Sequence, residues 1–119
     1  MGKANGPVVF HREQVEQAAE SLPPQRELER LGEFFKVLTD PTRLKILYAL
    51  GRGELCVFDL SVSVGAGVSS ASHHLAALKR VRLVKSRRDG RIIYYSLDDD
   101  HVNAIIEYAR EHLGEGGGV

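Results

Sequence analysis

Apolar residues recur every three or four positions along most of the chain, which is the spacing that places them on one face of an α-helix. This spacing predicts helices over residues 11–21, 27–38, 41–50, 57–62, 69–81 and 97–115. Pro23 and Pro24 separate the first two helices, because proline cannot donate the hydrogen bond that a helix interior needs. Asp40 is expected to cap the third helix, with Pro41 in its first turn.

The apolar period changes from helix to strand after Arg82. Residues 83–84 and 92–95 are runs that favour strands, and Asp89-Gly90 between them is a strong signal for a two-residue hairpin turn. A short helix, a glycine turn at 65–67 and a second helix come directly before this hairpin. The order predicts a mainly α fold with a β-hairpin wing, that is, a winged helix-turn-helix.

Length and composition set the limits of this prediction. A chain of 119 residues with 43% hydrophobic content is long enough for one globular domain, 1–119, with glycine-containing tails at 1–10 and 114–119 expected to be disordered. It contains no apolar run of membrane-spanning length and no secretory leader, so we expect a cytoplasmic protein with no membrane partner. The single cysteine, Cys56, agrees with a reducing compartment.

The net charge of zero hides two segments of opposite character. Residues 79–91 hold seven basic side chains and one acid, whereas residues 98–115 hold six acids, one arginine and two histidines. Clustered Lys and Arg bind DNA by displacing counterions from phosphates, so the first segment predicts a double-stranded DNA partner. The second segment offers the carboxylate and imidazole groups that bind metal ions.

The residues expected to contact DNA lie on the second helix of the helix-turn-helix and on the hairpin. They are Ser69, Ser70, Ser72, His73, Lys79, Arg87, Arg88 and Arg91. Short hydroxyls and an imidazole near the start of a recognition helix can reach base edges or phosphates. Two alternatives remain open: Ser69 is also a candidate N-cap, and the hairpin arginines could be ordinary solvated charges.

The last helix carries metal-binding side chains at both ends, with Asp99 and His101 at the first and His112 and Glu115 at the second. The two histidines are eleven residues apart, which separates them by about 16 Å along a helix, while zinc lies about 2 Å from each ligand nitrogen. A shared site therefore requires the same helix of a second, antiparallel copy. The geometry predicts a homodimer with two identical sites for zinc (Zn²⁺), with cobalt (Co²⁺) as a possible substitute. The alternative is surface histidines, with acids that complement the helix dipole.

The motifs DPTRLKILYAL (40–50), GELCVFDL (53–60), SSASHHLAALKRVRLVKSRRDGRIIYYSL (69–97) and DDDHV (98–102) resemble the ArsR/SmtB family of metal-sensing repressors. The resemblance covers about residues 27–115. It implies a winged-helix dimer, paired through its N- and C-terminal helices, that binds operator DNA without metal and releases it when an ion binds. The pattern of Asp99, His101, His112 and Glu115 is similar to the zinc-sensing branch, whose site lies across paired C-terminal helices.

Two departures from the family pattern bear on the signal. The thiolate-using branches carry a second cysteine where Phe58 stands, which weighs against arsenic, cadmium or lead. Cys56 and Asp59, with His11, are the candidates for a second metal site. Val68 occupies a position where a zinc-sensing relative carries a polar base reader.

Two other functions stay open at this point. One is a winged-helix repressor that responds to a thiol-reactive or soft-metal signal at Cys56, and the other is a dimeric metal-binding or interaction module without DNA binding. No catalytic triad and no glycine-rich phosphate loop is present in the sequence, so we do not expect an enzyme.

Overall fold

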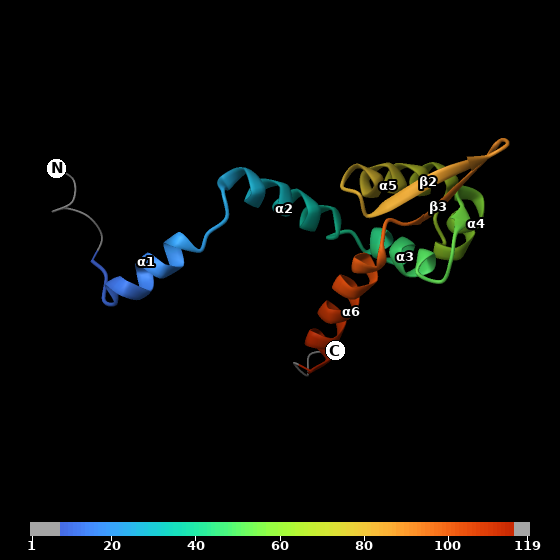
Figure 1. The fold of residues 1–119 in the computed structure, drawn as a ribbon. Helices are drawn as coiled ribbons and strands as arrows, with labels where there is room; N and C mark the ends of the chain where they lie inside the picture. The colour runs from blue at the N-terminus through green and yellow to red at the C-terminus, as the bar shows by residue number, and fades with distance from the viewer. Residues whose placement is uncertain (1–7, 116–119) are drawn as a thin grey trace. The chain divides into compact units, whose positions relative to one another are not determined.

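A computed structural model describes residues 8–115 of the chain (Figure 1). The elements in chain order are α1 (Arg12–Glu20), α2 (Gln25–Val37), α3 (Pro41–Leu50), β1 (Leu55–Cys56), α4 (Val57–Val64), α5 (Val68–Arg80), β2 (Val84–Asp89), β3 (Ile92–Leu97) and α6 (Asp100–Glu115). The chain divides into two compact units after Gly32. The first unit holds α1, none of whose side chains is buried, and the beginning of α2.

The second unit contains the hydrophobic core, which lies where α3, α4 and α5 meet the base of the hairpin. Its fully buried side chains are Ile46, Leu47, Leu60, Leu75, Leu78, Leu83 and Val84. Those on the helices follow the three-and-four spacing that predicted the elements, so each helix contributes one apolar face. The hairpin lies along α5, as Figure 1 shows, and this arrangement confirms the predicted winged helix-turn-helix order.

Asp40 begins α3 as the sequence predicted. Its Oδ1 accepts hydrogen bonds from the backbone N–H of Thr42 at 2.7 Å and of Arg43 at 3.3 Å, and Pro41 is the first helical residue. Desolvation raises the pKa of the Asp40 carboxyl, but these two amide donors, together with nearby positive charge, outweigh it, so the net pKa lies below the ordinary value. The cap therefore holds α3 in its place at the edge of the core.

The turn between α4 and α5 starts α5 one residue earlier than expected. Gly65 adopts a left-handed φ of 72° and ends α4, and Gly67 is the N-cap of α5 without a side-chain hydrogen bond. Ser69 therefore lies inside the first turn, and the alternative that it caps the helix is wrong. The reason is that the extended backbone of Gly67 already provides the cap position.

The hairpin turn is also shifted by one residue. Asp89 pairs with Ile92, so the two-residue loop is Gly90-Arg91 and not Asp89-Gly90. Gly90 has φ 66° and Arg91 does not have a positive φ, which is the pattern of a type II′ turn with glycine first. The strand β1, which the sequence did not reveal, pairs with β3 and completes a sheet of order β1-β3-β2.

Arg82 ends α5 in a conformation that glycine normally adopts, with φ 64°. The N–H of Leu83 donates to the carbonyl of Leu78 at 2.9 Å and the N–H of Arg82 to that of Lys79 at 3.0 Å, which is a Schellman motif. We expect Arg82→Gly to raise the free energy of unfolding by about 1 kcal/mol in urea titrations, because it removes the left-handed strain. Arg82→Ala keeps that strain and is the matched control; an equal gain in both variants would contradict the explanation.

Two helices leave apolar side chains uncovered. We expected 27–38 to be a core helix, but Leu28, Leu31 and Phe35 of α2 are exposed, and Val37 is its only buried residue. In α6, Val102 is buried, whereas Ile105, Tyr108 and Leu113 are exposed. Helical spacing identifies an apolar face but does not say whether the same chain covers it.

The C-terminal boundary also differs from the prediction. α6 continues through Gly114 to Glu115. The disordered tail predicted for 114–119 was therefore placed to begin two residues too early, because 114 and 115 are helical. One glycine costs a helix about 1 kcal/mol and does not by itself end it. Residues 1–7 and 116–119 of the predicted tails lie outside the described residues. Within residues 8–115, no helix has the length and apolar character required to cross a bilayer.

Candidate metal and DNA-binding sites

Asp99 and His101 form a local pair at the start of α6. Oδ1 of Asp99 accepts from the backbone N–H of His101 at 2.9 Å, and Oδ2 lies 3.3 Å from Nδ1 of the same histidine. The hydrogen bond from the His101 side chain, followed by that from its backbone, holds the pKa of Asp99 below its usual value despite desolvation. One carboxylate and one imidazole therefore lie together at this end of the helix, and zinc takes both kinds of donor.

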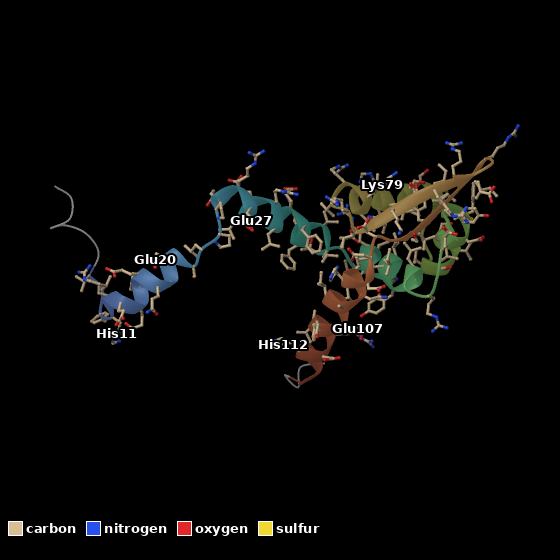
Figure 2. The ribbon with its side chains drawn as sticks, in the orientation of Figure 1. His11, Glu20, Glu27, Lys79, Glu107 and His112 are labelled. Carbon is tan, nitrogen blue, oxygen red and sulfur yellow. The ribbon has the colours of Figure 1, made fainter. Side chains whose placement is uncertain are left out.

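His112 lies at the other end of the same helix, where its side chain is exposed (Figure 2). Eleven helical residues separate it from His101 by about 16 Å, so the structure does not bring the two imidazoles together. The side chain of Glu115 lies outside the described part of the chain. Across the side chains that the structure describes, no three His, Cys, Asp or Glu residues gather closely enough to hold an ion. One chain thus presents two separate groups of candidate ligands.

The candidates for a second site occupy different parts of the fold. Cys56 is half-buried in β1, and Asp59 is exposed in the first turn of α4. His11 precedes α1 in the first unit of the chain. Cys56 and Asp59 thus share the segment from β1 to α4, whereas His11 belongs to the other unit.

The outward face of α5 presents the polar residues predicted to contact DNA. Ser69, Ser70, Ser72 and His73 are all exposed. The opposite face carries the buried residues Ala71, Leu75 and Leu78, so packing fixes which side of α5 is turned to solvent. His74 differs from its neighbour His73: it is half-buried and accepts a hydrogen bond from Arg43.

The predicted basic side chains are not equally free. Arg88 and Arg91 are exposed, but Arg87 forms two 2.7 Å hydrogen bonds with Glu54 and lies over the Tyr94 ring at 4.7 Å. The hydrogen bond from Arg87 lowers the pKa of Glu54, and the same contact raises the pKa of Arg87. No local sequence pattern predicts this pair, because Glu54 directly precedes the short strand β1, which was not predicted.

Lys79 has a structural contact as well. Its Nζ donates to Oγ of Ser86 at 2.8 Å and so ties α5 to β2. An ammonium group has three donors, so this contact leaves two for other acceptors.

Residues 40–86 match the family model described as "Bacterial regulatory protein, arsR family". The chain is 43% identical over 107 residues to the "Transcriptional repressor SmtB homolog" of Synechocystis, a match that covers 90% of this chain and 81% of the relative. The chain belongs to the ArsR/SmtB family of bacterial transcriptional regulators. The family is one of regulators, which agrees with the prediction that the chain is not an enzyme.

Other ArsR/SmtB proteins resemble the chain in sequence and in fold. The "Cadmium resistance transcriptional regulatory protein CadC homolog" of Staphylococcus aureus is 41% identical, over 89% of this chain and 88% of that protein. A solution structure from Mycobacterium bovis, described as a "homodimeric winged helix-turn-helix DNA-binding domain", has a TM-score of 0.69 at 30% identity, over 80% of this chain and 94% of that one. These likenesses confirm the predicted winged helix-turn-helix fold.

Proposed function

We propose that the chain is a homodimeric repressor that binds operator DNA without metal and releases it when zinc binds. The observation that carries this proposal is the placement of metal ligands on α6. Asp99 and His101 are paired at one end and His112 lies at the other, on a helix whose Ile105 and Tyr108 are exposed. An antiparallel second copy would cover those apolar side chains and bring each His101 beside the other chain's His112.

The dimer is supported by the uncovered faces of two helices. Phe35 in α2 is 52% exposed and Tyr108 in α6 is 73% exposed. Large apolar side chains grouped on a surface are typical of protein interfaces. The Mycobacterium bovis relative named as homodimeric has the same fold, which supports the dimer. A cytoplasmic location is part of the proposal, since it agrees with DNA as the partner.

Zinc is supported by the chemistry of the proposed ligands. Two imidazoles and two carboxylates, from Asp99, His101, His112 and Glu115, suit four-coordinate zinc, and cobalt can take the same place. The Staphylococcus aureus relative is named for cadmium, a soft ion that prefers thiolates. Cys56 is the only thiol in this chain, so the histidines of α6 favour zinc over cadmium.

DNA recognition is assigned to α5 and the wing. We place Ser69, Ser70, Ser72 and His73 in the major groove and the basic wing against phosphates. Two such surfaces in a two-fold dimer would contact half-sites about 34–36 Å apart. Zinc between the α6 helices favours a dimer geometry in which the two surfaces no longer match that spacing.

The proposal is tested by selecting duplexes from a randomised pool with metal-free protein. We expect inverted repeats to be enriched, and added zinc to release them. Selection of no common sequence, or binding that zinc leaves unchanged, would contradict the proposal. Random duplex measured over a series of salt concentrations separates general phosphate binding from specific recognition.

Val68 is expected to contact a thymine methyl group. It is the first residue of α5 and is 39% exposed, and a small apolar side chain at this place can pack against the methyl group in the major groove. Replacing the contacted thymine by uracil in the selected duplex should weaken binding about fourfold, the effect of one buried methyl group. Val68→Ser should remove this sensitivity, and sensitivity that persists in Val68→Ser would exclude the contact.

Arg88 and Arg87 are expected to differ in their share of phosphate binding. Both side chains are exposed, but Arg87 is also paired with Glu54. We expect Arg88→Gln to reduce the slope of log affinity against log salt by about 0.9, and Arg87→Gln to reduce it less. Equal reductions in the two variants would mean that Glu54 releases Arg87 to DNA.

A second candidate function follows from the position of Cys56. This thiol is half-buried rather than buried, so a thiol-reactive or soft-metal signal could reach it. In that case Cys56→Ser abolishes the response to the signal, while His101→Ala leaves it intact. The zinc mechanism predicts the opposite result for both variants.

A further inference from the structure

Two neighbouring histidines of α5, His73 and His74, have different surroundings although their rings lie edge to face at a centroid distance of 6.0 Å. His73 is exposed, whereas His74 is half-buried on the side of the helix that carries the buried Leu75 and Leu78. Nδ1 of His74 accepts a hydrogen bond of 3.0 Å from Nε of Arg43. A ring nitrogen that accepts a hydrogen bond carries no proton, so this contact requires an Nδ1 without hydrogen on His74.

Arg43 connects His74 to two other elements. Its Nη1 donates to the carbonyl of Val37 at 3.4 Å, and Val37 is the buried last residue of α2. Its backbone N–H donates to Oδ1 of Asp40, the N-cap of α3. One half-buried side chain near the start of α3 therefore joins the end of α2 to the middle of α5.

We infer that Arg43 and His74 are positioning residues that set the orientation of the recognition helix. The inference rests on the proposed function, in which the outward face of α5 reads DNA. The apolar contacts of Leu75 and Leu78 hold α5 against the core, but such contacts are not directional. A hydrogen bond has preferred distances and angles, so the Arg43–His74 contact fixes the rotation of α5 and the direction in which Ser72 and His73 point.

The same contact gives a path from the dimer to the DNA-reading surface. α2 carries the exposed Phe35 that we assign to the dimer interface, and its last carbonyl is bonded to Arg43. A change in the pairing of α2 would thus act on the side chain that holds His74. His73, one residue away, would be turned with the helix.

The first test needs no DNA. In wild-type protein with ¹⁵N-labelled histidine, NMR should show His74 with Nδ1 unprotonated and Nε2 protonated, assigned by the signals that disappear in His74→Asn. A proton on Nδ1 of His74 would overturn the hydrogen bond from Arg43, and with it the inference.

The second test compares binding of a duplex selected by the wild-type protein with binding of a random duplex. His74→Leu and Arg43→Met remove the hydrogen bond while keeping apolar bulk, and each should lower the ratio of selected to random affinity about tenfold. His74→Asn places an acceptor oxygen near the position of Nδ1 and should keep a ratio close to that of the wild type. The double variant His74→Leu/Arg43→Met should lose no more than either single change.

The outcomes separate positioning from stability alone. An unchanged ratio in His74→Leu, or a His74→Asn ratio as low as that of His74→Leu, would overturn the positioning role. A parallel loss of selected and random binding together with a lower melting temperature would also overturn it. If the wild type itself does not discriminate between the two duplexes, the proposed function fails, whereas the tautomer of His74 still tests the hydrogen bond separately.

Discussion

Zinc is expected to lower the affinity of the wild-type protein for its selected duplex by about 5- to 150-fold, the range of a typical coupling free energy of about 1–3 kcal/mol. The reason is that the ion binds the dimer geometry that does not fit DNA more tightly than the geometry that does. His101→Ala removes an imidazole that we assign to the ion, so the affinity of this variant for DNA should be the same with and without zinc. Fluorescence anisotropy of labelled duplex at fixed salt measures both affinities.

Glu111→Gln is the matched control for this experiment. Glu111 is an exposed acid on α6 next to His112, and it is not among the proposed ligands. Its zinc response should equal that of the wild type. A full zinc response in His101→Ala, or its loss in Glu111→Gln, would contradict the assignment of the ligands.

Phe35→Glu is expected to dissociate the dimer and to lower specific DNA affinity by about 10²- to 10⁴-fold, the gain that two linked binding surfaces have over one. Phe35 is 52% exposed, with its ring edge-to-face against Phe34 at a centroid distance of 5.4 Å. A buried carboxylate at the interface would be strongly unfavourable, whereas the same group on a free surface is harmless. The folded monomer should therefore survive.

Sedimentation velocity and binding of the selected duplex measure the two parts of this prediction. Phe35→Leu keeps an apolar side chain and should remain a dimer with near wild-type DNA affinity. A Phe35→Glu protein that sediments as a dimer would place the interface elsewhere on the molecule.

Local sequence signals predicted most of the fold. The Asp40-Pro41 start of α3 and the apolar spacing around Leu47 each depend on neighbours within a few residues, and both are confirmed. The strand β1 has only two residues, too few to show the alternation of a strand. The hairpin turn was predicted one residue early because Asp89 and Gly90 together form a strong turn signal, whereas the register places Gly90 first in the loop.

Contacts between distant parts of the chain could not be predicted. Arg87 and Glu54 are 33 positions apart, and Arg43 and His74 are 31 apart. Each pair depends on how α5 and the hairpin pack against earlier elements, which no local pattern records. Asp99 and His101, in contrast, are two residues apart at a helix start, so their proximity follows from the sequence alone.

The separation of His101 and His112 also followed from helix geometry. Apolar spacing could not show whether Ile105 or Phe35 would be covered by the core of the same chain, and both are exposed. Apolar side chains that repeat along one helix face yet stay exposed in the single chain support the proposed dimer.

The central claim, a zinc site shared between two chains, is tested most directly by mixing two inactive variants. Homodimers of His101→Ala lack His101 in both sites, and homodimers of His112→Ala lack His112 in both, so neither should bind zinc tightly. In a heterodimer of the two variants, one site lacks both histidines and the other site is intact. We predict one tightly bound zinc ion per purified heterodimer; a heterodimer that binds none would contradict a site built from His101 of one chain and His112 of the other.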